Sequence, residues 1–259
     1  MQLPSTFDLS GRTALITGAG SPTGIGFASA RLLGRLGAAV VLTSTTGRVH
    51  DRVAELTGEG ITATGIVARL EHEAGVDGLV AALGTASPTV LVNAAGMVAI
   101  GEPMGSGDIT VDPAAWDAAL AQNLTSAFLV TRAVVPRMRA AGWGRIVHVS
   151  SVTGPVMASR ADLAYAAAKA GMVGLTRALA IDEAQHGITA NAVAPGWIAT
   201  GSQLPQEAAE GARVPAGRSG APDEVAAAIA WLCTPGAAYT TGQVLVVDGG
   251  NSVAEQRLP

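Results

Sequence analysis

The amino-acid sequence predicts an α/β fold: a doubly wound, seven-stranded parallel sheet with helices on both faces. Short, unbroken runs of apolar and β-branched residues alternate along the chain with longer alanine-rich segments. Unbroken apolar runs of this length suit strands that are buried on both faces, as the strands of a parallel sheet are. Since strand and helix segments alternate, the helices are expected to connect parallel strands and to cover both faces of the sheet.

The predicted elements are spread over the whole chain. The strands are 13–17 (TALIT), 39–43 (AVVLT), 64–68 (TGIVA), 89–93 (TVLVN), 145–150 (RIVHVS), 188–193 (ITANAV) and 243–248 (QVLVVD). Helices are expected in GIGFASARLLGRLG (24–37), around 114–141 and 162–186, and in PDEVAAAIAWLC (222–233). No low-complexity linker or charged tail separates these segments, so we expect one domain over residues 1–259.

The overall composition excludes several classes of partner. The net charge is −4 and no block of basic residues occurs, so no nucleic-acid partner is expected. The sequence contains no uninterrupted run of about 18 apolar residues, so no membrane span is expected. The N-terminus, MQLPSTFDLSGR, lacks the basic and then apolar pattern of a secretory signal. The single cysteine, Cys233, fits a reducing compartment. We therefore expect a cytoplasmic protein with no membrane partner.

A glycine-rich stretch, TGAGSPTGIG (17–26), links the first predicted strand to the first predicted helix. Glycine lets the backbone approach a phosphate, and a helix N-terminus offers free N–H groups and the positive end of a dipole. The stretch therefore favours a dinucleotide phosphate site; the alternative is a loop whose glycines serve turn geometry alone. A P-loop is excluded, because that motif needs a lysine in the loop and the one lysine of the chain, Lys169, lies far downstream.

The end of the second predicted strand reads LTSTTGR (42–48) and holds no carboxylate. An acidic residue near this point usually binds the ribose 2′-hydroxyl of NAD. The hydroxyls of Ser44 and Thr45 and the guanidinium of Arg48 suit a 2′-phosphate instead, so NADP is expected in preference to NAD. In the alternative, Arg48 is a solvated residue in the first turn of the next helix.

Tyr165 and Lys169 form the most informative pair in the chain. The whole sequence contains one lysine and two tyrosines, and Lys169 follows Tyr165 by four residues in a segment that favours a helix. Residues at i and i+4 share one helix face. A nearby ammonium lowers the pKa of a phenol from about 10 toward neutrality, which lets tyrosine exchange a proton with a carbonyl or alcohol oxygen. The alternative is a half-buried tyrosine beside a surface lysine.

Six motifs in chain order resemble the short-chain dehydrogenase/reductase family, and the likeness runs from Leu9 to about Ser252. They are the glycine turn, Asn93-Ala94-Ala95-Gly96, Asn123, Ser150-Ser151, Tyr165-x-x-x-Lys169 and Pro195-Gly196. Within that family, VPAGRSGAPDEVA (214–226) and TTGQVLVVDGG (240–250) are most similar to the 3-oxoacyl-(acyl-carrier-protein) reductase group. The resemblance implies a single-domain Rossmann fold and an oxidoreductase that uses a nicotinamide cofactor.

The resemblance also implies four catalytic residues. Tyr165 would be the general acid toward a carbonyl oxygen, and Ser151 would donate a hydrogen bond to the same oxygen. Lys169 would bind the nicotinamide ribose. Asn123 would hold a water in a proton relay, and the stabilisation of a helix kink is a compatible alternative role for it.

The implied cofactor site lies in the loops that follow the strands. The glycine turn would line the pyrophosphate and ribose, and the segment after Pro195 would meet the nicotinamide. The full set of candidates is Gly18, Ser21, Gly24, Ile25, Gly26, Ser44, Thr45, Arg48, Arg69, Leu70, Asn93, Ala94, Gly96, Tyr165, Lys169, Pro195, Gly196, Ile198 and Thr200. No metal site is expected, because the four histidines show no ligand spacing.

The chain departs from the family pattern in two places. The family's turn, T-G-x-x-x-G-x-G, carries two extra residues here, with Gly24-x-Gly26 as its anchored end. After the third strand, Arg69 stands where the family commonly has an aspartate that accepts a hydrogen bond from the adenine. Arginine cannot accept that bond, but it can stack on the adenine ring or approach a 2′-phosphate.

The expected function is NADP(H)-dependent reduction of a ketone or 3-oxoacyl carbonyl to a secondary alcohol, with a loop at about 201–214 covering the small-molecule substrate. An alcohol dehydrogenase working mainly in the oxidative direction is one alternative. A non-catalytic, nucleotide-sensing protein on the same fold is another, since fold does not determine function. Members of the family are usually tetramers, so the resemblance implies a homotetramer.

Overall fold

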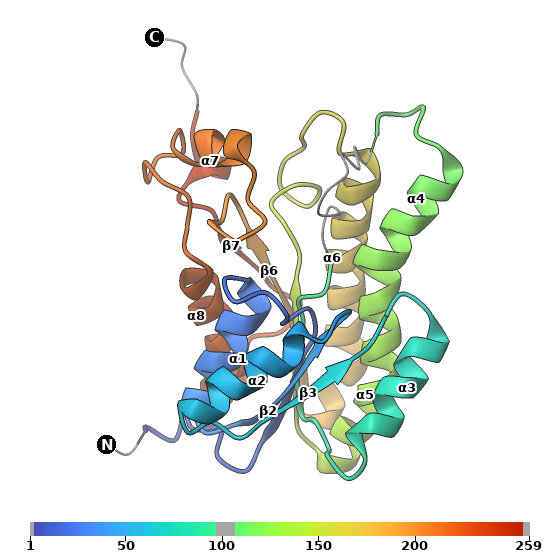
Figure 1. Cartoon of the computed structure of the whole chain (residues 1–259), viewed down its shortest axis with the longest axis vertical. Helices are drawn as coiled ribbons and strands as arrows, with labels where there is room; N and C mark the ends of the chain where they lie inside the picture. Colours follow the sequence, from blue (N-terminus) through green and yellow to red (C-terminus); the bar gives the residue numbers. More distant parts are fainter. Residues whose placement is uncertain (1–2, 97–106, 256–259) are drawn as a thin grey trace.

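The computed structural model of the chain describes residues 3–96 and 107–255. At its centre is a seven-stranded sheet in the order β3-β2-β1-β4-β5-β6-β7, and every pair of neighbouring strands runs parallel (Figure 1). The strands are β1 (Thr13–Ile16), β2 (Ala39–Ser44), β3 (Ala63–Val67), β4 (Val90–Asn93), β5 (Gly144–Val149), β6 (Ile188–Pro195) and β7 (Val244–Val247). Each overlaps a predicted strand, and the predicted fold class is confirmed.

Eight α-helices occur in the described part of the chain. They are α1 (Ile25–Arg35), α2 (Arg48–Gly58), α3 (Glu73–Leu83), α4 (Pro113–Leu120), α5 (Ser126–Ala141), α6 (Leu163–Glu183), α7 (Pro205–Gly211) and α8 (Pro222–Cys233). The helix expected around 114–141 is divided by a π-helical turn at Ala121–Thr125. The segment expected as a substrate-covering loop, 201–214, contains α7.

The core consists of two apolar layers, one on each face of the sheet. Consecutive residues of a strand point to opposite faces, so Ala14 and Ile16 belong to one layer and Leu15 to the other. The first layer is completed by buried side chains of α1, α2 and α8, and the second by those of α3, α5 and α6. The sheet is therefore covered on both sides, as the unbroken apolar strands predict.

One helical segment, Pro113–Ala141, is long and apolar enough by composition to cross a membrane. Half of its most apolar window is buried inside the fold, and α5 contributes Leu129, Val130, Val134 and Met138 to the core. The segment therefore packs as a core helix of the fold.

Candidate active site

The two central strands, β1 and β4, lie side by side although β2, β3 and three helices separate them in the sequence. At such a point the connections leave toward opposite sides, and a crevice opens at the carboxyl ends of the strands. The Thr17 hydroxyl joins the two ends there by accepting hydrogen bonds from the amides of Ala94 (3.1 Å) and Ala95 (2.9 Å). Sequence reasoning did not select Thr17; its signal is a hydroxyl residue between a strand and a glycine turn.

The glycine turn is a close-packed backbone cradle. Gly18 has φ +68°, and a Cβ atom there would lie 2.7 Å from the Ala94 carbonyl oxygen. A Cβ at Gly26 would lie 2.8 Å from the Gly18 oxygen. Helix α1 begins at Ile25 without a side-chain cap and without an acidic residue in its first turn. Its first N–H groups therefore remain available to an anion, and these residues fit the diphosphate of a dinucleotide.

The two extra residues of the turn contact the segment that follows β6. The Gly24 amide donates to the Ser21 carbonyl (3.3 Å) and closes a tight turn over Pro22 and Thr23. A Cβ at Gly201 would lie 2.6 Å from the Thr23 hydroxyl oxygen. The lengthened turn therefore packs directly on the backbone of residue 201.

Helix α6 carries Tyr165 and Lys169 on one face. The Lys169 ammonium lies 5.5 Å from the centre of the Tyr165 ring and donates to the Val149 carbonyl at the end of β5 (3.0 Å). Lys169 is buried, and this burial lowers the pKa of its ammonium to about 8. The alternative of a surface lysine is therefore wrong.

The prediction that the pKa of Tyr165 is shifted toward neutrality is also wrong, because the net shift is upward. Burial raises the pKa of the phenol, the Ser151 hydroxyl opposes this rise by hydrogen bonding, and the charges of Asp162 and Glu207 add to it. The physical reason is that desolvation of the phenolate outweighs the stabilising groups around it. Tyr165 therefore keeps its proton at neutral pH, as a general acid requires.

The two serines after β5 have different partners. The Ser150 hydroxyl donates to the Lys169 carbonyl (2.9 Å) and so attaches helix α6 to the sheet. The Ser151 oxygen accepts the Thr153 amide (3.1 Å) and interacts with the Tyr165 phenol. The structure places Ser151, the predicted catalytic serine, against the tyrosine.

Asn123 lies in the π-helical turn between α4 and α5, a distortion that is frequent at functional sites. Its amide nitrogen donates to the Ala119 carbonyl (3.1 Å). Its buried oxygen has no hydrogen-bond partner among the described residues. A Cβ at Gly96 would lie 2.8 Å from that oxygen and 3.4 Å from Lys169 Nζ. Gly96 therefore leaves room beside two polar atoms, and the unpaired oxygen fits a site that receives a water or a ligand hydroxyl.

The segment after β2 presents Arg48 to solvent. Its Nε donates to the Thr46 hydroxyl (3.1 Å), Thr45 is exposed, and the Ser44 hydroxyl accepts the Thr46 amide (3.3 Å). Arg48 forms no ion pair with any residue that the structure describes. Arg48 is also the first residue of α2, so the solvated position and a role in phosphate binding are compatible.

The two candidate residues after β3, Arg69 and Leu70, differ in how available their side chains are to a ligand. The guanidinium of Arg69 pairs with Glu71 (2.8 Å) and is largely exposed. The Leu70 side chain is buried in the second core layer, so only its backbone is left for a ligand. An ion-paired Arg69 is less available to a phosphate than Arg48 is.

The predicted nicotinamide segment follows the end of β6. The Gly196 amide donates to the Val247 carbonyl (3.0 Å), which holds the segment against β7. Ile198 is buried and its carbonyl accepts the Thr200 amide (2.7 Å). The Thr200 hydroxyl pairs with Ser202 (2.9 Å). These residues therefore lie at the carboxyl ends of the strands, as does the glycine turn that Gly201 contacts.

Beneath the site runs a buried polar chain. Asn93 donates to the Thr131 hydroxyl (3.0 Å), and His148 lies 3.5 Å from Thr131 and 2.8 Å from the Thr176 hydroxyl. Burial lowers the pKa of His148 to about 4, with the Lys169 charge as a smaller cause. His148 is thus a neutral packing residue. Among the described residues no group of three or more His, Cys, Asp or Glu could hold a metal ion.

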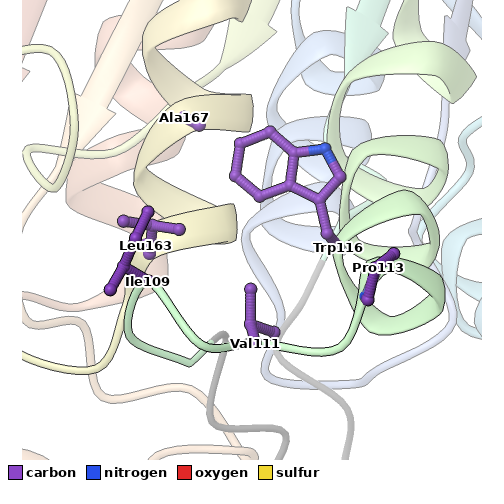
Figure 2. Close-up of a pocket in the computed structure, with 6 residues that line it drawn as sticks. All are labelled: Ile109, Val111, Pro113, Trp116, Leu163 and Ala167. Carbon is purple, nitrogen blue, oxygen red and sulfur yellow. The ribbon is translucent and has the colours of Figure 1, made fainter.

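An apolar cavity of about 490 Å³ lies on the other side of α6, lined by Ile109, Val111, Pro113, Trp116, Leu163 and Ala167 (Figure 2). The indole of Trp116 projects from α4 toward α6. Leu163 and Ala167 lie on the helix face opposite Tyr165 and Lys169, because positions two residues apart point about 200° away from each other. The cavity is therefore separate from the catalytic pair.

Comparison with known proteins agrees with this geometry. A family model described as enoyl-(acyl carrier protein) reductase matches residues 18–252. The chain is 37% identical to 3-oxoacyl-[acyl-carrier-protein] reductase from Pseudomonas aeruginosa, covering 93% of this chain and 98% of the relative. It is 39% identical to cis-4-hydroxycyclohexanecarboxylate dehydrogenase from Sinomonas cyclohexanicum, covering 92% and 96%.

A solved structure shares the whole architecture. Gluconate 5-dehydrogenase from Burkholderia cenocepacia, in complex with NADP and tartrate, superposes with a TM-score of 0.86 at 32% identity. The match covers 97% of this chain and 99% of that chain. With the family model and the relatives, this confirms the resemblance drawn from the sequence: the chain belongs to the short-chain dehydrogenase/reductase family and is an NAD(P)-dependent oxidoreductase.

Proposed function

We propose that the protein is an NADP(H)-dependent reductase that converts a ketone or 3-oxoacyl carbonyl to a secondary alcohol. The observation that carries the proposal is the arrangement of Tyr165, which interacts with the Ser151 hydroxyl and lies beside the buried ammonium of Lys169. The three groups provide a proton donor, a hydrogen-bond donor for developing negative charge, and a cation that stabilises the phenolate left behind.

When bound, the nicotinamide supplies the hydride. Tyr165, which its raised pKa keeps protonated at neutral pH, donates its proton to the substrate oxygen. The Ser151 hydroxyl, whose oxygen accepts the Thr153 amide, lies against the Tyr165 phenol and would donate its hydrogen to the substrate oxygen once the substrate is bound. Lys169 stabilises the phenolate, and the unpaired oxygen of Asn123 orients a water that returns the proton.

The chain's own residues also support a preference for NADP over NAD. The segment from the end of β2 to the start of α2 carries Ser44, Thr45 and Arg48, and no carboxylate. A guanidinium binds a 2′-phosphate well, whereas a carboxylate at this point would repel it. NADP is the cofactor bound in the related gluconate 5-dehydrogenase.

An alcohol dehydrogenase working mainly in the oxidative direction is the alternative, since the same residues catalyse both directions. The relatives act on 3-oxoacyl groups, a hydroxycyclohexane carboxylate and gluconate, according to their names. A silent nucleotide sensor is disfavoured, because such a protein would not need both Tyr165 and Lys169.

We further propose a cytoplasmic homotetramer built from one domain over residues 1–259. Exposed apolar side chains on α5 and α6 support assembly: Phe128 is 46% exposed and Ile181 80%. Leu245 and Val246 of the edge strand β7 are also exposed, and such an edge is usually covered. The segment 201–214, with α7, would cover the substrate.

The test is NADPH oxidation with acetoacetyl-CoA and a panel of cyclic and linear ketones, run beside Tyr165→Phe. We expect the variant to lose at least about 100-fold in kcat while it binds NADPH as the wild type does. Equal turnover by both proteins would show that Tyr165 is not the acid. NADPH binding without turnover in either direction would favour the sensor.

A further inference from the structure

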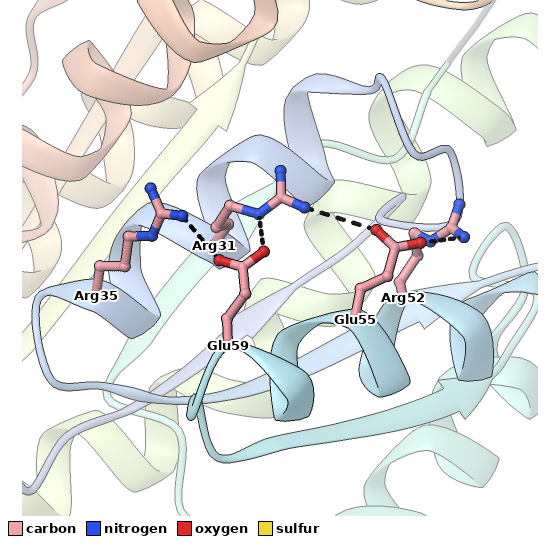
Figure 3. Close-up of polar contacts among 5 residues, drawn as sticks. All are labelled: Arg31, Arg35, Arg52, Glu55 and Glu59. Carbon is pink, nitrogen blue, oxygen red and sulfur yellow. Dashed lines mark hydrogen bonds and ion pairs between the residues drawn. The ribbon is translucent and has the colours of Figure 1, made fainter.

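Five charged side chains join the outer surfaces of α1 and α2 (Figure 3). Arg31 of α1 lies 2.8 Å from Glu59 and 3.6 Å from Glu55 of α2. Glu59 also binds Arg35 (2.8 Å), and Glu55 also binds Arg52 (2.5 Å). Because each glutamate has two arginine partners, the five side chains form one continuous network that spans both helices.

Two arginines of the network contact Phe27, a fully buried residue in the first turn of α1. The guanidinium of Arg31 lies 4.6 Å from the centre of the Phe27 ring, and that of Arg52 lies 5.4 Å from it. Arg31 belongs to α1 itself, whereas Arg52 comes from α2. Arg52 is therefore the charged residue of α2 that contacts the phosphate-binding end of α1.

Apolar packing alone holds α2 weakly. Of its eleven residues only Val49 and Leu56 are fully buried, while α1 buries six. Exposed ion pairs contribute little one by one. The Arg52 side chain, however, is only 12% exposed, and it combines an ion pair with a cation–π contact. Its ion-pair partner Glu55 belongs to the same helix, so the link of Arg52 to α1 is its contact with the buried Phe27 ring.

Arg48, the candidate for the 2′-phosphate, is one helical turn before Arg52 on the same face of α2. A shift of α2 would move Arg48 away from the 2′-phosphate position. The glycine turn and the start of α1, which would bind the diphosphate common to both cofactors, would remain in place. A defect in the position of α2 should therefore weaken NADPH binding and leave NADH binding almost unchanged.

We propose that Arg52 is a positioning residue for cofactor discrimination: by packing its guanidinium, which Glu55 of the same helix holds, on the Phe27 ring of α1, it sets the distance between the diphosphate cradle of α1 and Arg48 of α2. The inference rests on the proposed preference for NADP. Arg52 would act through the position of Arg48 and not by binding the cofactor itself.

The test compares the dissociation constants of NADPH and NADH, measured by fluorescence titration, in wild type, Arg52→Met, Arg52→Lys and Arg35→Met. Arg35 is the matched control. It belongs to the same network and its loss removes the same charge, but it joins only the C-terminal ends of the two helices. Unchanged NADH binding in a variant also shows that the variant is folded.

We expect Arg52→Met to weaken NADPH binding about fivefold and NADH binding by less than about twofold. Arg35→Met should leave the ratio of the two constants as in wild type. Arg52→Lys keeps the charge but not the planar fork, so the preference for NADPH over NADH should fall in this variant too. An unchanged ratio in Arg52→Met, an equal change in Arg35→Met, or a wild-type ratio in Arg52→Lys would overturn the inference. A wild-type preference for NADH would instead refute the proposed cofactor.

Discussion

The ammonium nitrogen of Lys169 lies 5.5 Å from the centre of the Tyr165 ring and is held there by the Val149 carbonyl at 3.0 Å. The pair is buried, so each charged form is costly: burial lowers the pKa of Lys169 to about 8 and raises that of Tyr165. The arrangement therefore keeps the phenol protonated and the ammonium close to deprotonation. This relation leads to two predictions, and the cofactor side of the site and the surface of the molecule lead to three more.

Lys169→Met should stabilise the protein at neutral pH. The folded pKa of Lys169 is about 8 and its ordinary value is 10.5, so the unfolded chain binds more protons between these values and stability rises with pH through that window. At pH 7 the variant avoids the buried charge and should gain about 2 to 3 kcal/mol in the free energy of unfolding. Urea unfolding of both proteins at pH 7 and at pH 10.5 measures this. A gain that is the same at both pH values would contradict it.

The rate of carbonyl reduction should fall as pH rises above about 8. Tyr165, whose pKa is raised, still carries its proton there, but Lys169 loses the charge that stabilises the phenolate. His148, with a pKa of about 4, stays neutral throughout. A kcat profile from pH 6 to pH 10 should show one descending limb. A profile that stays flat to about pH 9.5 would mean that the charge of Lys169 is not needed.

Gly96→Ala should impair cofactor binding without unfolding the protein. Gly96 has φ +138°, and a Cβ there would lie 2.8 Å from the Asn123 oxygen. The methyl group would fill the space beside Asn123 and Lys169, so the affinity for NADPH should fall by about tenfold or more. Gly78→Ala is the control, because Gly78 lies within α3 with open space around its Cβ position. Isothermal titration calorimetry with NADPH measures the affinity of both variants. Equal NADPH affinities in the two variants would exclude a cofactor role for Gly96.

Arg48→Ala should weaken NADPH binding by about tenfold and leave NADH binding unchanged, since an arginine–phosphate pair is a charge-assisted contact that only NADPH offers. Arg69→Ala is the matched control, because Arg69 is exposed and already paired with Glu71. Titration with both nucleotides at two salt concentrations tests this. A larger effect from Arg69 would move the 2′-phosphate site to the end of β3.

Light scattering should give a mass of several times 25.8 kDa, the mass of one chain. Ile181 of α6 and Phe128 of α5 expose apolar side chains that an interface between copies would cover. Ile181→Asp should shift the assembly toward smaller species, because it places a charge in a dehydrated interface. Val67→Asp is the control, since Val67 is also exposed but lies on β3, at the opposite edge of the sheet. A wild-type mass near 25.8 kDa would refute the tetramer.

Much of the fold could be predicted from local patterns. The apolar runs located all seven strands, because a strand buried on both faces needs apolar side chains at every position. The helix predicted around 114–141 was correct in extent and wrong in regularity. The π-helical turn at Ala121–Thr125 places Asn123 among residues distant in sequence, and local helix propensity does not show such a distortion.

The sequence by itself determined which groups are present: one lysine four residues after a tyrosine, a glycine turn, and a second strand that ends without a carboxylate. Only the tertiary structure decided their electrostatics. Tyr165 has a raised pKa because folding removes water from the phenol, and no spacing in the sequence reports that loss. The tertiary structure likewise decided that Arg69 pairs with Glu71, whereas Arg48 has no ion pair among the residues that the structure describes, and that Arg52 reaches Phe27. Each of these depends on how separate elements pack together, because burial and long-range contacts exist only once the chain is folded.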